Sequence, residues 1–176
     1  MKLLTKFQDY DIIDNWTEPS AEVTQKVIDL WKRNSILPAG AAAEERAKQV
    51  VLAALNAEGK AVGVNTVYEG HFPHAPEAQD RVSCYFYRMF IEPAHRRPHL
   101  MRVMTTSAFD VLQETRPKDG PQSFIIITEN PGLTGPGMLR LFERFGYRVW
   151  RKTPRGQLVI RRDFGPKEAS TVPSVA

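Results

Sequence analysis

Apolar positions along the chain switch between helical spacing and strand-like runs, and their order predicts the secondary structure. Residues 7–16 predict a first strand, and residues 42–48 predict a short helix. Between them, Ser20 is a suitable N-cap for a helix whose apolar positions share one face, namely Val23, Val27, Leu30 and Trp31. Residues 49–55 and 60–68 then predict a hairpin.

The middle of the chain is dominated by a buried strand that leads into an amphipathic helix. Residues 82–91 are apolar or aromatic on both faces, a pattern typical of a central strand. A basic turn follows, and a helix then carries apolar residues at helical spacing, which are Leu100, Val103, Met104, Ala108, Val111 and Leu112. Residues 116–121 end this helix, and residues 123–128 predict a second buried strand.

A last helix and a hairpin complete the predicted order. Pro136 suits the first turn of the helix, and Gly146 suits the C′ position at its end. Residues 147–152 and 157–163 predict the two strands of the hairpin. This order predicts an α/β fold in which helices pack over a single sheet.

Length and composition are those of one globular domain, which we place at residues 1–164 of the 176. Residues 165–176 have no pattern, and we expect them to be disordered. Hydrophobic content of 42% and charged content of 25% argue against disorder of the whole chain. No apolar run approaches the ~20 residues that span a bilayer, and the N-terminus meets charge too early for a signal peptide. A single cysteine, Cys84, fits a reducing compartment, so we expect a cytoplasmic protein without a membrane partner.

The net charge of +4 is unevenly distributed. One basic cluster lies in the predicted turn, at Arg96, Arg97 and Arg102, and a longer one covers residues 140–162. Basic surface attracts the phosphates of a cofactor, a nucleic acid or a membrane, although a basic face also serves simple solubility. For residues 140–162 both interpretations stay open, and nucleic acid is a possible partner of that region.

The segment from Tyr85 to Leu112 combines a strand, a basic turn and a helix N-terminus, which together form a natural site for a pyrophosphate. The strand ends in Ile91-Glu92-Pro93, and Arg96 follows in the turn. This arrangement resembles the cofactor-binding motif of the GCN5-related N-acetyltransferase (GNAT) superfamily. The family places Gln or Arg first in this motif and glycines fourth and sixth. Here the glycine positions hold His99 and Met101, which is a departure from the family pattern.

A second motif resembles the later part of the same family: a buried strand, a helix, and then Phe145-Gly146-Tyr147. Many members carry a tyrosine three residues before the first aromatic residue, where it protonates the leaving thiolate. That position is Phe142 here, which has no proton to donate.

The resemblance implies a fold, an activity and a set of ligand-binding residues. The fold would be a single mixed, mostly antiparallel sheet flanked by helices. The activity would be transfer of an acyl group, by default acetyl, from acetyl-CoA or another acyl-CoA to an amine acceptor, with no metal and with a homodimer as a possible assembly. The implied cofactor-binding residues are Phe90, Ile91, Arg96, Arg97, His99, Leu100, Met101 and Arg102.

Candidate catalytic residues lie at the ends of the two buried strands. Tyr85 and Tyr87 share one face of the first strand if side chains alternate, and a tyrosine is a reasonable acid for a thiolate. Each is also a common core residue. Glu129 and Asn130 end the second strand, facing the cleft expected for the acceptor. A cationic acceptor would be attracted by the acidic side chains of the neighbouring loop, Glu69, Glu77 and Asp80, although a solvated acidic loop explains these residues equally well.

The histidines and the cysteine have simpler explanations. The pairs His71-x-x-His74 and His95-x-x-x-His99 invite a metal site, but no carboxylate is placed convincingly beside the loop pair, and surface histidines are the better explanation. Cys84 lies within a buried strand and is expected to be a small core residue.

Two alternatives to an ordinary N-acyltransferase remain. The basic region favours an enzyme of the same fold that acts on an amine carried by a nucleic acid. The missing motif glycines and the missing tyrosine favour a non-catalytic binding module built on that fold.

Overall fold

The computed structural model describes residues 1–37, 42–71, 83–128 and 131–166. Within these ranges one sheet of eight strands forms the centre of the molecule. The strands are β1 (Lys2–Phe7), β2 (Tyr10–Asp14), β3 (Val50–Leu55), β4 (Ala61–His71), β5 (Ser83–Ile91), β6 (Ser123–Ile127), β7 (Arg148–Lys152) and β8 (Leu158–Asp163). Their order is β1-β2-β3-β4-β5-β6-β8-β7, and every neighbouring pair is antiparallel except β5 with β6.

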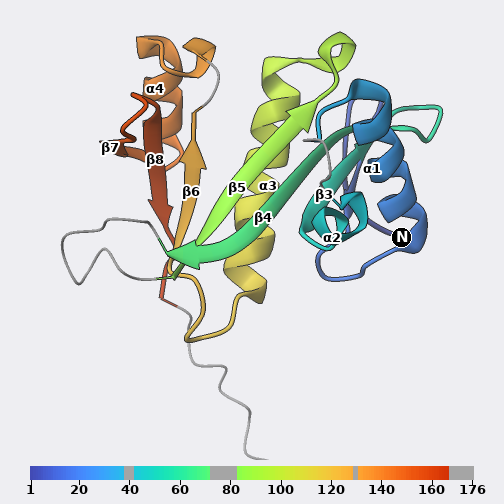
Figure 1. Ribbon diagram of the computed structural model, residues 1–176, viewed down its shortest axis with the longest axis horizontal. Helices are drawn as coiled ribbons and strands as arrows, with labels where there is room; N and C mark the ends of the chain where they lie inside the picture. Colours follow the sequence, from blue (N-terminus) through green and yellow to red (C-terminus); the bar gives the residue numbers. More distant parts are fainter. Residues whose placement is uncertain (38–41, 72–82, 129–130, 167–176) are drawn as a thin grey trace, which may run out of the picture.

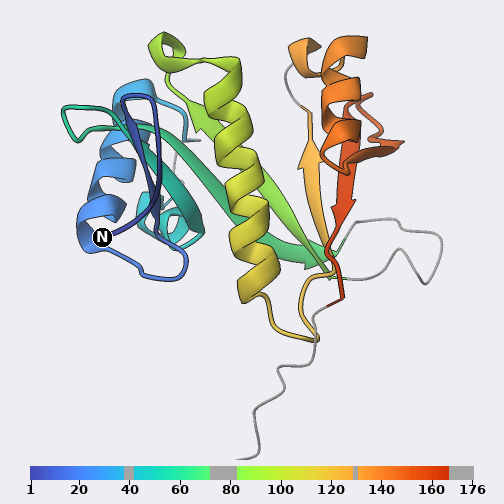
Figure 2. The ribbon, with the colours of Figure 1, turned by 180° about the vertical axis from the view of Figure 1, so that it is seen from behind.

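Helices cover both faces of this sheet. They are α1 (Ala21–Asn34), α2 (Ala43–Ala47), α3 (Pro98–Thr115) and α4 (Pro136–Arg144), with short 3-10 turns η2 (Pro93–His95) and η3 (Pro131–Leu133). Helices α1 and α2 pack on one face, and α3 and α4 lie on the other, as Figures 1 and 2 show from opposite sides. Within the ranges described above, no helix is both long and apolar enough to cross a bilayer.

The predicted elements are confirmed with one exception at the N-terminus. Ser20 caps α1 by accepting a hydrogen bond from the Val23 N–H, and Gly146 follows α4 with a φ of +77°. The strand predicted at residues 7–16 is confirmed over Tyr10–Asp14 as β2, but it is the second strand and not the first, because the chain turns at Gln8, which has a φ of +52°, and a preceding strand, β1, pairs with it as a hairpin. Strand β1 is an edge strand with mostly exposed side chains, so it lacks the apolar alternation that would have revealed it.

Helix α3 is held against the sheet by packing and by one buried amide. Two of its own side chains, Leu100 and Met104, are fully buried in the core. The side chain of Asn65 in β4, also fully buried, accepts a hydrogen bond from the Leu52 N–H at 2.8 Å and donates one to the Met104 carbonyl at 3.1 Å. Gly63 permits the close approach, since a Cβ there would lie 3.1 Å from the Met104 sulfur. The position of α3 relative to β4 and β5 is therefore tightly specified.

Candidate functional site

Strands β5 and β6 pair over only part of their length. Their parallel register joins Cys84–Tyr87 of β5 to Ser123–Ile126 of β6. Strand β5 then continues to Ile91, still paired with β4 up to the position of Gly63, while β6 ends at Ile127. Figure 1 shows the two strands diverging toward their carboxyl ends. We call the β5 segment Arg88–Ile91, which has no register partner in β6, the splayed edge.

The register shows which backbone groups of the splayed edge face away from β4. The Glu92 N–H donates to the Val62 carbonyl of β4 at 2.8 Å. Because the two sides of a strand alternate, the N–H and carbonyl of Phe90 also point to β4, and those of Met89 and Ile91 point to the opposite side. The Ile91 carbonyl accepts a hydrogen bond from Arg96 Nε at 3.0 Å. The groups presented on this side are therefore the N–H and carbonyl of Met89 and the N–H of Ile91.

The splayed edge leads through the short η2 turn to the N-terminus of α3. Arg97 is its N-cap, makes no side-chain capping hydrogen bond, and is followed by Pro98 at the first helical position. His99 and Leu100 come next, and their N–H groups have no acceptor within the helix because it begins too close to them. The first turn contains no acidic residue. Free N–H donors at the positive end of an 18-residue helix favour an anion here.

The eight implied cofactor-binding residues contribute to this region in different ways. The side chains of Arg96, Arg97, His99 and Arg102 are exposed around the turn, whereas Leu100 is fully buried. The Met101 N–H donates to the Arg97 carbonyl at 3.2 Å, so the helix itself uses that donor. Of the two residues that replace motif glycines, His99 thus keeps an available N–H and Met101 does not. The assignment of these residues to a cofactor stays a prediction.

The turn between β5 and α3 is anchored by residues that sequence reasoning missed. The Glu92 carboxylate accepts hydrogen bonds at 2.9 Å from Arg33 Nε and from Asn34 Nδ2, both at the end of α1. The bond from Arg33 holds the pKa of Glu92 below its usual range. On the other side of the turn, His95 Nδ1 and the Tyr10 hydroxyl are 3.0 Å apart. No periodicity links residues so distant in sequence, so only the folded chain reveals these anchors.

The two candidate tyrosines of β5 both lie beneath α3. Tyr85 packs edge-on against Trp16 and Phe164, and burial raises the pKa of its phenol. Tyr87 is the last β5 residue paired with β6. Its hydroxyl lies 3.2 Å from Thr105 Oγ1, and burial raises its pKa well above the usual range. It also donates to Met89 Sδ at 3.3 Å, which places it directly under the splayed edge.

The two remaining catalytic candidates, Glu129 and Asn130, lie outside the described residues. So do Glu77 and Asp80 of the acidic loop. Phe142, at the family's tyrosine position, packs on Tyr147 with ring centroids 5.7 Å apart. Burial raises the pKa of Tyr147 to about 12, and its hydroxyl meets no hydrogen-bond partner in the described structure, although Arg162 is close enough to oppose the rise.

Neither the histidines nor the cysteine form a reactive cluster in the part of the chain that the structure covers. Cys84 is fully buried, which confirms it as a core residue. His71 is the last residue of β4, His74 lies outside the described ranges, and His95 is bonded to Tyr10. No three His, Cys, Asp or Glu side chains among the described residues come together as a metal site.

The basic region of residues 140–162 spans α4, β7 and β8, and part of its charge is neutralised. Asp163 accepts hydrogen bonds from Arg148 Nη2 at 2.9 Å and from Arg161 Nε at 2.6 Å. The Trp150 ring is contacted by two guanidinium groups, with Arg151 3.7 Å and Arg161 4.9 Å from its centroid. The rest of the region is largely exposed, and its binding of nucleic acid stays a prediction.

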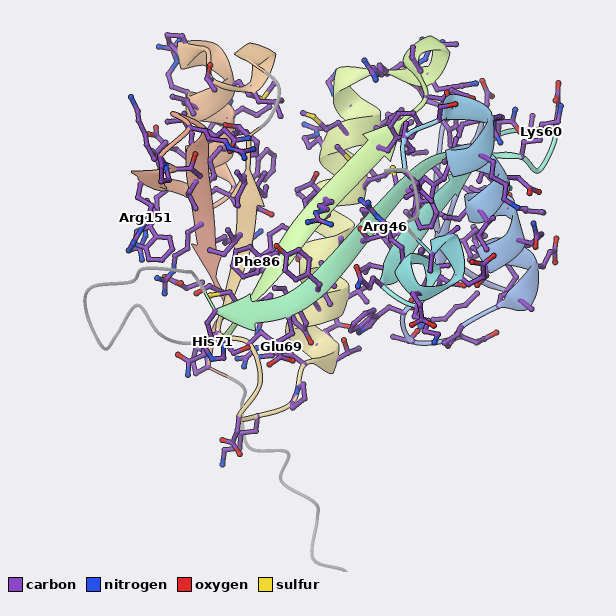
Figure 3. The ribbon with its side chains drawn as sticks, in the orientation of Figure 1. Arg46, Lys60, Glu69, His71, Phe86 and Arg151 are labelled. Atoms are coloured by element: carbon purple, nitrogen blue, oxygen red, sulfur yellow. The ribbon has the colours of Figure 1, made fainter. Side chains whose placement is uncertain are left out.

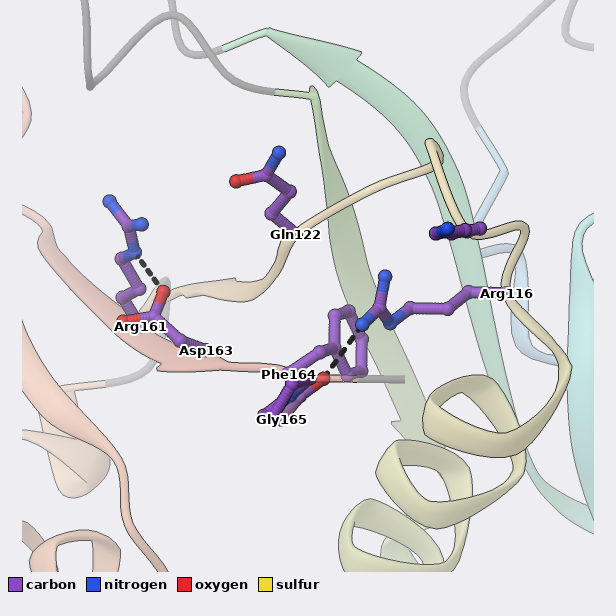
Figure 4. Close-up of a pocket in the computed structure, with 8 residues that line it drawn as sticks. Arg116, Gln122, Arg161, Asp163, Phe164 and Gly165 are labelled. Atoms are coloured by element: carbon purple, nitrogen blue, oxygen red, sulfur yellow. Dashed lines mark hydrogen bonds and ion pairs between the residues drawn. The ribbon is translucent and has the colours of Figure 1, made fainter. Parts of the chain in front are cut away.

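A pocket of about 370 Å³ lies at the other end of β6 from the splayed edge (Figure 4). Gln122, which precedes β6, and Asp163, which ends β8, line it. Arg116 also lines it, donates to the Gly165 carbonyl at 2.8 Å and lies over the Phe164 ring. These contacts tie the end of β8 to the end of α3, so we assign the pocket a structural role.

Comparison with known proteins identifies the fold. No protein-family model and no curated protein matches this sequence. Solved structures do match. A GNAT-family acetyltransferase from Streptococcus pneumoniae aligns with a TM-score of 0.61 and 11% identity, covering 89% of this chain and 99% of the other. A GNAT phosphinothricin acetyltransferase from Sinorhizobium meliloti, solved with acetyl-CoA, aligns with a TM-score of 0.59 and 11% identity, covering 94% and 97%.

A GCN5-related N-acetyltransferase from Kribbella flavida aligns with a TM-score of 0.56 and 14% identity, covering 89% of this chain and 98% of the other. At such identities the similarity establishes the architecture. The prediction of a mixed, mostly antiparallel sheet flanked by helices, in the arrangement of the GNAT acetyltransferases, is confirmed.

Proposed function

We propose that the protein is an N-acyltransferase that moves an acyl group, by default acetyl, from acyl-CoA to an amine. The observation that carries this proposal is the splayed edge that runs into the uncapped, arginine-bearing N-terminus of α3. The edge supplies backbone groups for an extended ligand, and the helix supplies N–H donors for a phosphate at one end of it. A pantetheine arm ending in a pyrophosphate has both features.

Each part of the site has a defined role in this proposal. The N–H groups of His99 and Leu100 bind the pyrophosphate, and the exposed Arg97 and Arg102 add charge-assisted hydrogen bonds. Arg96 orients the end of β5 through its bond to the Ile91 carbonyl. Acyl-CoA, bound as co-substrate, would supply the activated acyl group as a thioester.

The splayed edge also offers the donors that acyl transfer requires. An attacking amine places negative charge on the acyl oxygen, and a preorganised N–H that accepts this charge lowers the barrier. The Met89 and Ile91 N–H groups face the required side, and we assign the oxyanion to Met89, nearer the point where β5 and β6 separate. As the C–N bond forms and the C–S bond breaks, the departing thiolate takes up one proton and the amine nitrogen loses one, which returns to the group that protonated the thiolate. Tyr87 stays protonated because burial raises its pKa, and its hydroxyl reaches Met89, so we assign it the proton donor's role.

Calorimetric titration tests the proposal. Wild-type protein should bind acetyl-CoA with a micromolar dissociation constant, and free CoA, which keeps the pyrophosphate, should bind with similar strength. Arg97→Ala should weaken both by roughly tenfold, the value of about one charge-assisted hydrogen bond. The control is Lys6→Gln, which removes one positive charge from β1, the edge strand of the sheet that lies far from β5. Failure of the wild-type protein to bind either ligand would refute the proposal and favour a non-catalytic binding module.

The identity of the amine acceptor and the nucleic-acid alternative are tested with the same purified protein. A panel of amines, followed by release of free thiol, measures the transferase activity itself. A binding titration with a short RNA tests the nucleic-acid alternative. If residues 140–162 bind the RNA phosphates, the affinity should fall steeply as salt is raised. The cytoplasmic location and the homodimer stay predictions.

A further inference from the structure

The face of the sheet opposite α3 carries an aromatic surface beside the splayed edge. Tyr68 and Phe86 stack on this face with ring centroids 5.1 Å apart and planes at 14°. Ile127, the last residue of β6, packs in the same cluster. In Figure 3 the labelled Phe86 side chain lies over β4 and β5, on the face toward the viewer. We call Tyr68, Phe86, Arg88 and Ile127 the acceptor face.

Arg88 brings the positive charge of this surface. It is the first β5 residue beyond the register with β6, and its side chain is exposed. Its guanidinium carbon lies 4.8 Å from the centroid of the Tyr68 ring. Among the described residues it forms no ion pair. Stacking on an aromatic ring leaves the in-plane N–H donors of a guanidinium free to bind a carboxylate or phosphate.

The nearby carboxylates of described residues do not neutralise Arg88. Glu69 follows Tyr68 in β4, so alternation directs it to the other face, where its carboxylate accepts a hydrogen bond from Ser83 Oγ at 2.6 Å. Asp163 is bonded to Ser123, Arg148 and Arg161, and Glu92 is bonded to Arg33. Glu69 therefore offers nothing on this face to a cationic acceptor, and the described charge here is positive.

We propose that the acceptor amine also carries an oxyanion group, a carboxylate or phosphate, which Arg88 binds while an apolar or aromatic part of the acceptor packs on the partly exposed ring of Tyr68, which the buried Phe86 supports from beneath. The inference rests on the acyltransferase function proposed above. Acyl-CoA would approach from the α3 end of the splayed edge, so an acceptor held by Arg88 lies across the same edge with its amine directed at the acyl group. Arg88 is thus a specificity-determining residue for small anionic amines such as amino acids.

The test compares three acceptors that share one skeleton: phenylalanine, phenylalaninamide and phenethylamine. We expect the wild-type kcat/KM to be about ten- to a hundredfold higher for phenylalanine than for either analogue that lacks the carboxylate, the value of a charge-assisted bidentate contact. Arg88→Gln should lower the ratio of kcat/KM for phenylalanine to kcat/KM for the amide toward one. Arg88→Lys keeps the charge but loses the planar fork, so it should restore only part of the preference. Lys6→Gln serves as the charge-matched control. O-phosphoserine and serine form a second pair that distinguishes phosphate from carboxylate recognition.

Failure of this inference differs from failure of the proposed function. If acetyl-CoA binds and the wild-type enzyme prefers phenethylamine or a diamine, or if Arg88→Gln leaves the ratio unchanged, anion recognition is refuted and the transferase stands. If acetyl-CoA does not bind, N-acetylphenylalanine and its amide are compared by ligand-observed NMR, which needs no cofactor. Binding of the acid that disappears in Arg88→Gln supports the anion site, and equal binding of acid and amide overturns it.

Discussion

Replacing Met89 with proline tests the proposed oxyanion donor, because it removes one backbone N–H from the splayed edge. The Met89 N–H points away from β4, so proline removes no hydrogen bond of the β4–β5 ladder. Arg88, the preceding residue, lies in a strand and already has the extended backbone that a following proline requires. The side chain of Met89 is only half-buried, so its loss should cost about 1 kcal/mol of stability.

The expected magnitude is large for catalysis and small for folding. Loss of a single oxyanion donor costs about 10²–10³ in kcat, or roughly 3–4 kcal/mol of transition-state stabilisation. Met89→Ala shortens the same side chain and keeps the N–H, so the ratio of the two variants isolates the donor. Phe90→Pro is the opposite control. Its N–H faces β4, and its removal should destabilise the fold by about 3 kcal/mol or more.

The assay is steady-state release of free thiol over a range of acetyl-CoA concentrations at saturating amine, together with thermal unfolding of each variant. We expect Met89→Pro to lose kcat with little change in KM for acetyl-CoA, while Met89→Ala keeps most of its activity. Equal kcat for the two variants, with both folded, would refute the assignment of Met89. In that case the Ile91 N–H would be the remaining donor on this side of β5.

Three further substitutions test other parts of the site. Glu92→Gln should weaken acetyl-CoA binding and lower stability by about 1 kcal/mol at neutral pH. Because Arg33 lowers the pKa of Glu92 in the folded state, this stability is present above the unfolded pKa of about 4.3 and is lost as pH falls through the folded value, so wild type and variant should converge in acid unfolding curves. Tyr87→Phe should reduce kcat roughly a hundredfold with KM unchanged, whereas Tyr85→Phe, remote from Met89, should not; equal effects on kcat would contradict the proton-donor role. Tyr147→Phe should be neutral or stabilising by about 1 kcal/mol in thermal unfolding, since it removes a buried hydroxyl that lacks a hydrogen-bond partner among the described residues; clear destabilisation would show that the hydroxyl is satisfied by Arg162.

Periodicity in the sequence predicted the fold well because burial dictates it. The apolar run of β5 and the helical spacing from Leu100 to Leu112 are direct consequences of a strand and a helix that share one core. The edge strand β1 was not predicted, because burial does not constrain the residue types of an exposed strand. The turn at Gln8 was not predicted either, because a positive φ is common at glycine and a glutamine in the sequence does not indicate one.

The site was predictable only where the chain is locally continuous. The strand, the turn and the helix N-terminus follow one another, so their joint role could be inferred from residues 85–112. The contacts of Glu92 with Arg33 and of His95 with Tyr10 join distant segments and leave no trace in a single sequence. Likewise, the choice between Phe90 and its neighbours as donors depends on the hydrogen-bonding side of a strand, which register alone decides.

The hydrogen bond between Arg96 and the Ile91 carbonyl has a consequence for the behaviour of the protein in concentrated solution. A strand with unpaired groups along one side is a template on which the strand of another molecule can assemble, and such pairing propagates into aggregates. Here the guanidinium occupies the terminal acceptor, and the charged side chain of Arg88 stands at the other end of the same short segment. The strand of a second molecule needs several consecutive free backbone N–H and carbonyl groups, and this segment offers too few of them for stable pairing. A narrow, non-peptide ligand needs only the few groups that remain. The same two arginines therefore discourage self-association while leaving room for a small ligand.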